Sequence, residues 1–191
     1  MAKCSIESSL LLIPVLIIAE TLCIIPKMTK KTENTLEELI GIKLTYSTRS
    51  GNMECLKFGH KIDSKNQDIG EFGLHIQSDW RIINEKNILV GSNDLFEPSS
   101  ENESEMEFDY EKGNLRDEKL RSLINSNELV VSSIIDDEIG GLKIIFNNQV
   151  ELQIIPTNSS KSEYNEFWRL IDNRGVESKH IVSRIDGIEN E

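Results

Sequence analysis

Apolar and polar residues alternate along much of this chain, most clearly in the stretch FGLHIQSDWRI at residues 72–82. Every second residue there, beginning with Phe72, is apolar except Ser78. Successive side chains of a strand point to opposite faces, so the pattern predicts one long strand with a buried and a wet face. We expect the following apolar side chains in the core: Phe72, Leu74, Ile76 and Trp80.

Shorter segments with the same alternation, or rich in β-branched residues, predict the remaining strands. Turn signals at residues 50–52, 84–87 and 147–149 predict three hairpins, and residues 64–71 are expected to form a loop. The expected strand segments are residues 40–49, 53–62, 88–92, 127–136, 142–146, 150–156, 166–173 and 178–188.

The segment NLRDEKLRSLIN, residues 114–125, predicts the clearest helix of the chain. Asn114 can cap it, acidic residues fill its first turn, and Leu120, Leu123 and Ile124 form an apolar stripe. A capping pattern that begins at Asn34 predicts one further short helical turn, closed by Gly41.

These elements predict an α+β, mainly β fold: an antiparallel sandwich or partly open barrel of about eight short strands, with one helix across an end. We expect a single globular domain at residues 28–191, which includes an acidic surface loop at residues 94–114. No internal repeat and no nucleotide-binding fingerprint occurs in the sequence.

An apolar run at residues 9–26 stands apart from this domain, and three interpretations of residues 1–27 remain open. The run is just long enough for a membrane anchor, with lysines after it that would keep the main domain in the cytoplasm. It could also be a signal peptide, or follow from a start codon placed upstream of Met28. The residues that would form a membrane segment are Leu10, Leu11, Leu12, Ile13, Val15, Leu16, Ile17, Ile18, Leu22, Ile24 and Ile25.

The formal net charge of −12 restricts the partners worth considering. An acidic surface without a Lys/Arg stripe disfavours nucleic acid and could suit a basic protein partner. Its other interpretation is simple solvation. The three cysteines, two of them in the apolar run, form no pairing or zinc pattern and fit a reducing compartment.

The polar set of the 72–82 strand is the principal candidate site, because its side chains would share one face. Trp168-Arg169 repeats the dipeptide Trp80-Arg81, and the two are expected as neighbours in the sheet. A histidine and a carboxylate there could serve acid–base chemistry, although a charge ladder on a solvated face is the commoner explanation. The candidate ligand-binding residues are His75, Gln77, Asp79, Arg81, Arg169 and His180.

Other catalytic and metal chemistry finds little support in the sequence. The histidines are scattered, no GxSxG motif exists, and the acidic loop lacks the spacing of a calcium-binding loop. We therefore expect no metal, no cofactor and no catalytic residue.

Several segments together resemble an uncharacterised family of small bacterial proteins. The resemblance covers about residues 35–190 and rests on GLHIQSDWRI, VGSNDLF, IGGLKIIFNNQVELQIIP, EFWRLID and KHIVSRIDGIE. These contain the His-Ile-Gln…Trp-Arg, Gly-Ser-x-Asp and Glu-x-Trp-Arg motifs, although Phe167 stands where that family usually has a histidine. The resemblance implies a soluble bacterial domain and no mechanism.

These observations favour a non-enzymatic binding protein, similar to an immunity protein, that presents an acidic surface to a partner. The alternative is a small enzyme or ligand-binding β domain that uses the polar strand face around His75, Asp79 and Arg81.

Overall fold

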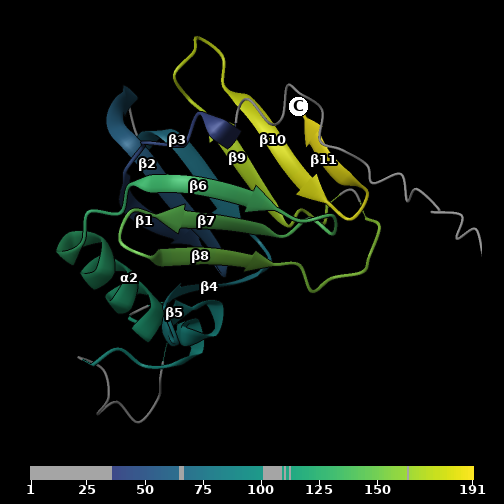
Figure 1. Ribbon diagram of the computed structural model, residues 1–191. Helices are drawn as coiled ribbons and strands as arrows, with labels where there is room; N and C mark the ends of the chain where they lie inside the picture. Colours follow the sequence, from purple (N-terminus) through teal and green to yellow (C-terminus); the bar gives the residue numbers. More distant parts are fainter. Residues whose placement is uncertain (1–35, 65–66, 101–108, 110, 112, 163) are drawn as a thin grey trace, which may run out of the picture.

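The protein is described by a computed structural model that covers residues 36–64, 67–100, 109, 111, 113–162 and 164–191. The described residues form eleven strands in two antiparallel sheets, the α-helix α2, one short 3-10 helix and a helical turn at residues 36–37 (Figure 1). The expected mainly β, α+β sandwich is therefore confirmed. The predicted membrane segment at residues 9–26 lies outside the described residues. Within them, no helix has both the length and the apolar character needed to cross a bilayer.

The first sheet has six strands in the order β1-β2-β3-β9-β10-β11. Its strands are β1 (Leu44–Ser50), β2 (Met53–Ser64), β3 (Gln67–Ile76), β9 (Trp168–Asp172), β10 (Lys179–Arg184) and β11 (Gly187–Asn190). The second sheet has five strands in the order β5-β4-β8-β7-β6. Its strands are β4 (Asp79–Asn84), β5 (Asn87–Gly91), β6 (Val131–Asp136), β7 (Leu142–Phe146) and β8 (Val150–Ile155).

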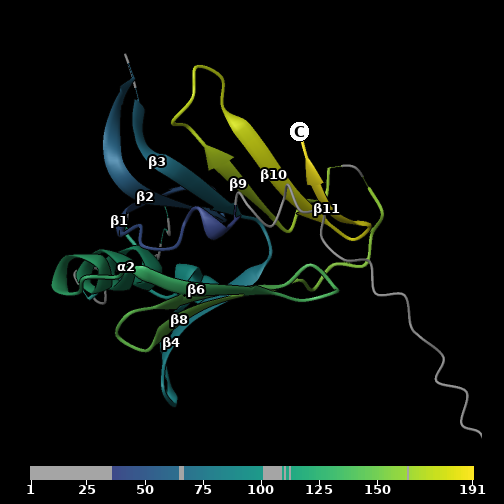
Figure 2. The same ribbon diagram turned by 45° about the horizontal axis from the view of Figure 1, so that its top comes forward.

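The core lies between the two sheets, which form separate layers in Figure 2. Each sheet contributes one tryptophan to it, Trp168 from β9 and Trp80 from β4, and both are at most 2% exposed. The four apolar residues expected in the core from the 72–82 stretch are buried to the same degree. Burial of one face of each strand explains why alternation was the dominant signal.

The expected single strand at residues 72–82 is wrong, because the chain changes sheet in its middle. Gln77 and Ser78 both donate their backbone N–H to Phe167 O, at 3.0 and 3.1 Å, and separate β3 from β4. The apolar alternation continues through this crossover since both sheets bury their inner faces in the same core. The pattern therefore predicted which side chains are buried, but not to which of the two sheets each residue belongs.

Two further expectations need correction. The loop expected at residues 64–71 is largely strand, with β3 beginning at Gln67, and the strand expected at residues 178–188 is a hairpin of β10 and β11. The three hairpins predicted from turn signals are all present, as β1–β2, β4–β5 and β7–β8. In the acidic segment, residues 101–108, 110 and 112 lie outside the described part, and its start belongs to the 3-10 helix η1 (Ser92–Phe96).

The helix α2 (Leu115–Ser126) confirms the helix expected at residues 114–125. Asn114 caps it by accepting a hydrogen bond from the N–H of Asp117 (2.9 Å). Leu120 and Ile124 of the apolar stripe are buried. The helix lies across the end of the sandwich next to β1 and β5 (Figure 1).

A short junction joins the two sheets beside α2. Lys43 bridges Val130, and Leu44 donates its N–H to Leu129 O (2.8 Å). Past this junction β1 turns away from β6, so most of β1 lies at the outer edge of its sheet.

Candidate binding groove between β1 and α2

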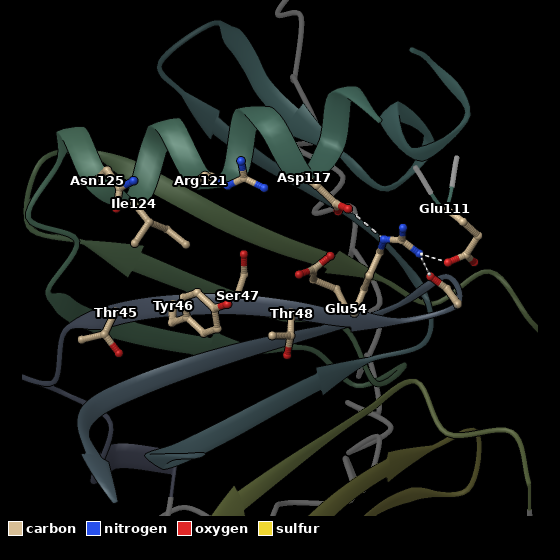
Figure 3. Close-up of a pocket in the computed structure, with 12 residues that line it drawn as sticks. Thr45, Tyr46, Ser47, Thr48, Glu54, Glu111, Asp117, Arg121, Ile124 and Asn125 are labelled. Carbon is tan, nitrogen blue, oxygen red and sulfur yellow. Dashed lines mark hydrogen bonds and ion pairs between the residues drawn. The ribbon is translucent and has the colours of Figure 1, made fainter. Parts of the chain in front are cut away.

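A cavity of about 600 Å³ lies between the edge strand β1 and the helix α2. Figure 3 shows the strand along one side and the helix along the other. Its volume falls in the range typical of ligand pockets. Its lining residues are Thr45, Tyr46, Ser47, Thr48, Arg49, Gly51, Glu54, Glu111, Asp117, Arg121, Ile124 and Asn125.

The cavity follows the free edge of β1 rather than one of its faces. Side chains of neighbouring strand residues point to opposite faces, yet the five consecutive residues from Thr45 to Arg49 all line the cavity. Only a hollow that runs along the strand edge can contact residues whose side chains point to both faces of the sheet. The cavity is therefore a groove parallel to the backbone of β1.

Ser47 directs its backbone polar groups into this groove. Leu44 donates its N–H away from β2, and the β1–β2 register shifts between Leu44 and Tyr46. Backbone groups of successive residues point to alternate sides of a strand, so after the shift the N–H and C=O of Ser47 also face away from β2. Among the described residues, Ser47 has no hydrogen-bond partner outside the β1–β2 ladder.

One face of α2 forms the opposite wall. Asp117, Arg121, Ile124 and Asn125 have the spacing i, i+4, i+7 and i+8, which brings them to a single side of a helix. Arg121 and Asn125 are exposed, whereas Ile124 is buried and forms an apolar floor.

Ion pairs gather at the end of the groove near the β1–β2 turn. Arg49 donates through Nε to Asp117 Oδ2 (2.8 Å), and its Nη1 lies 3.5 Å from Glu111 Oε2. These contacts tie β1 to the first turn of α2 (Figure 3). The accessible carboxylates and guanidinium groups of the lining are equal in number, because its third carboxylate, Glu54, is only 1% exposed.

Glu54 belongs to this end of the groove and forms a buried ion pair with Arg116. Its Oε2 lies 3.3 Å from Arg116 Nε, and both side chains are only 1% exposed. Arg116 also donates to the carbonyl of Asn52 (3.2 Å), and its guanidinium lies 5.9 Å from the centre of the Trp80 ring. Two charges are thus buried against the core with few hydrogen bonds to compensate them.

Burial controls the proton affinity of both groups. Desolvation raises the pKa of Glu54 to about 7, despite the opposing effect of the Arg116 charge. Desolvation likewise lowers the pKa of Arg116. Glu54 therefore exchanges its proton near neutral pH.

Sequence analysis missed this pair although a signal was present. Glu54 falls in the same register as Leu56 and Phe58, which are buried, and Arg116 precedes Leu120 and Ile124 on the apolar side of the helix. A charged residue in an apolar register is the signature of a buried charge. Nothing in that signature indicates that the two segments meet.

Four of the six candidate site residues do come together, on the outer face of the six-stranded sheet. His75 lies directly opposite Arg169 on the neighbouring strand, and Arg169 Nη1 contacts His180 Nδ1 at 2.7 Å. Gln77 donates to Glu166 Oε2 (3.4 Å), which also accepts from Arg169 Nε (2.9 Å).

Arg169, the arginine of this cluster, already forms ion pairs with carboxylates. Arg169 pairs with Glu166 and with Glu191 (2.9 Å), and the hydrogen bond from Arg169 lowers the pKa of Glu166. Burial, followed by the charge of Arg169, lowers the pKa of His75. The arrangement is an ion-pair network with a neutral histidine at its side, and it leaves little of Arg169 for an anionic ligand.

The other two candidates, Asp79 and Arg81, lie on β4 in the second sheet. Arg81 donates to Gln153 on β8 (2.9 Å), and Asp79 accepts from Thr157 (3.2 Å). The two Trp-Arg dipeptides are therefore not neighbours, because β4 and β9 belong to different sheets. Gln77, Asp79 and Glu166 do share a hollow of about 270 Å³ at the crossover between the sheets.

The described residues offer no evident metal site and no reactive thiol. Among them, His, Cys, Asp and Glu residues form no group of three or more suited to a metal ion. Burial raises the pKa of the Cys55 thiol, which keeps it protonated at neutral pH.

Comparison of the chain with protein-family models, with curated proteins and with solved structures found no match.

Proposed function

We propose that this protein is a non-enzymatic interaction module that binds a basic partner protein through the groove between β1 and α2. The observation that carries the proposal is an open groove of about 600 Å³ lined by the free edge of a strand and by one face of a helix. A strand edge and a helix face are surfaces that commonly receive a partner segment.

Charge supports a basic partner. The chain has a net charge of −12, which attracts a basic protein over long range and increases the rate of association. Glu111, which is 58% exposed at the groove end, can then pair with a basic side chain of the partner. An immunity-like role, in which an acidic protein covers the basic surface of a toxin, is the biological form of this proposal.

Photo-crosslinking in the native cells tests the proposal. Benzoylphenylalanine replaces Ser47 in the groove and, as a matched control, Lys86 in the exposed β4–β5 turn. We expect a basic protein to be crosslinked from position 47 and not from position 86, with a yield that falls as salt rises. Identical products from both positions, or a yield insensitive to salt, would contradict the proposal.

A charge reversal sharpens this test. Glu111 is 58% exposed and lines the groove, so Glu111→Lys should weaken the identified complex about 5–10-fold without disturbing the core. The same reversal at Glu85, an exposed turn residue that does not line the groove, should change affinity less than 2-fold.

A further inference from the structure

We infer that the groove receives an extended peptide segment of the partner, which joins the six-stranded sheet as an added strand beside β1. The inference rests on the proposed function and specifies how the partner is recognised. The outward N–H and C=O of Ser47 provide the backbone groups with which an added strand pairs. Unpaired strand edges pair with another strand unless something covers them.

The open part of the β1 edge suits a short added strand. Leu44 already pairs with Leu129 and Arg49 is tied to Asp117, which leaves residues 45–48, an edge of about 13 Å at 3.3 Å per residue. The side of α2 with Arg121, Ile124 and Asn125 forms the far wall (Figure 3). A strand in this position would pair with β1 on one side and pack against α2 on the other.

The two faces of the added strand would meet different chemistry. Ser47 and Arg49 are opposite Leu56 and Glu54, and this face looks toward α2, where Asp117 lines the groove. On the other face, Tyr46 and Lys57 line a second hollow of about 270 Å³, which shares Thr45 and Tyr46 with the groove. We therefore expect a bound segment with a Lys or Arg on the α2 side and apolar or hydroxyl side chains on the Tyr46 side.

A partner segment suits the groove better than a second copy of this chain. Two copies would bring together surfaces that each carry a net charge of −12. A basic segment is instead attracted by that net charge, and its cations can reach Glu111, which is 58% exposed at the groove end.

A display library of random seven-residue peptides, selected on the full chain, provides the probe. Proline at an outward-facing edge position removes one N–H and leaves the β1–β2 ladder intact. Ser47→Pro should therefore reduce the affinity of enriched peptides at least 10-fold, while Ser47→Ala binds within 2-fold of the parent chain. Circular dichroism and thermal unfolding verify that both variants are folded.

N-methylation of an enriched peptide gives a second readout that requires no protein variant. In an added strand, only alternate peptide amides face β1. Methylation of one alternate set should abolish binding, whereas methylation of the other set should change affinity less than 3-fold.

Several outcomes overturn the inference. The first is that no selected peptide binds the parent chain more tightly than the Ser47→Pro chain. The second is that peptides methylated on either alternate set of amides bind equally well. The third is that the parent chain forms a dimer without peptide, and that Ser47→Pro dissociates this dimer. The last outcome would make a second copy the occupant. Crosslinking from position 47 to a basic protein would survive the first two results, so they overturn the inference alone, whereas a dimer through the groove would overturn the proposed function as well.

Discussion

At the residue scale, the most consequential feature is a carboxylate and a guanidinium placed where the sequence pattern requires apolar side chains. Glu54 and Arg116 are each 1% exposed and lie between the core and the groove. Replacement of such a pair by apolar residues is often neutral for stability, whereas loss of one partner is costly.

The raised pKa of Glu54 predicts that stability decreases as pH increases. Folded Glu54 keeps its proton up to about pH 7, whereas the unfolded chain releases it near 4.5, so the folded state binds more protons between these values. The stabilisation is complete below pH 4.5 and is lost through pH 7, by up to roughly 3 kcal/mol at 1.4 kcal/mol per pKa unit.

Urea unfolding at pH 5 and pH 8 measures this effect. The lowered pKa of His75 acts in the opposite direction, so the decisive comparison is between variants. Glu54→Gln should raise the free energy of unfolding at pH 8 relative to that at pH 5, and Glu85→Gln at an exposed turn should leave the difference as in the parent chain. A Glu54→Gln chain with the same difference as the parent would refute the prediction.

Gly140 permits the second residue-level prediction. Its φ is +89°, and an added Cβ would lie 2.7 Å from Phe167 Cδ2 and 2.9 Å from Ser183 Oγ. Its carbonyl also accepts the indole N–H of Trp168 (2.8 Å). Gly140→Ala should lower the free energy of unfolding by about 2–3 kcal/mol, from backbone strain and steric overlap together.

Gly51→Ala isolates the backbone part of that cost. Gly51 also has a positive φ, of +60°, but no atom lies within 4 Å of the added Cβ. Its substitution should cost only about 1 kcal/mol. Equal losses for the two glycines in urea unfolding would show that packing around Gly140 contributes nothing.

At the scale of elements, the groove depends on how firmly α2 is held beside β1. Asn114 caps the helix and also donates to Asp117 Oδ2 (2.9 Å), the carboxylate that accepts from Arg49. The cap and the cross-link from helix to strand therefore share one residue, Asp117.

Removal of this cap should loosen the helix and the groove together. Asn114→Ala should lower the free energy of unfolding by about 1 kcal/mol. Hydrogen exchange should accelerate in the first turn of α2 more than in β7, which lies in the interior of its sheet. Ser122→Ala, at an exposed helix position, serves as the control and should change stability by less than about 0.5 kcal/mol.

At the scale of the whole molecule, the two sheets share a core but are built from distant segments. The β3–β9 pairing joins Ile76 to Trp168, and the chain between them forms the second sheet and α2. Because such long-range contacts must form before the core closes, folding should be slow, on the order of milliseconds to seconds.

Stopped-flow fluorescence can follow each sheet separately. Trp168→Phe leaves the tryptophan of β4 as the probe, and Trp80→Phe leaves that of β9. If the sheets fold around one core, both variants should show the same principal folding phase. A microsecond phase, or one tryptophan becoming buried long before the other, would indicate two independent folding units.

Local signals in the sequence determined a large part of this fold. Helix α2 was predicted to within one residue at each end, since capping and an apolar stripe act over neighbouring residues. The three hairpin turns and the burial of Phe72, Leu74, Ile76 and Trp80 follow from equally local rules. Alternation is local as well, and it fixed which side of each strand faces the core.

Only the tertiary structure decided which strands are neighbours, and with that the candidate sites. Alternation is the same on both sides of the crossover at Gln77 and Ser78, so the sequence could not separate Asp79 from His75. The meetings of His75 with Arg169 and of Glu54 with Arg116 join segments far apart in the chain. The physical reason is that pairing and packing depend on the whole set of competing strands, whereas the sequence pattern records only the burial of each residue.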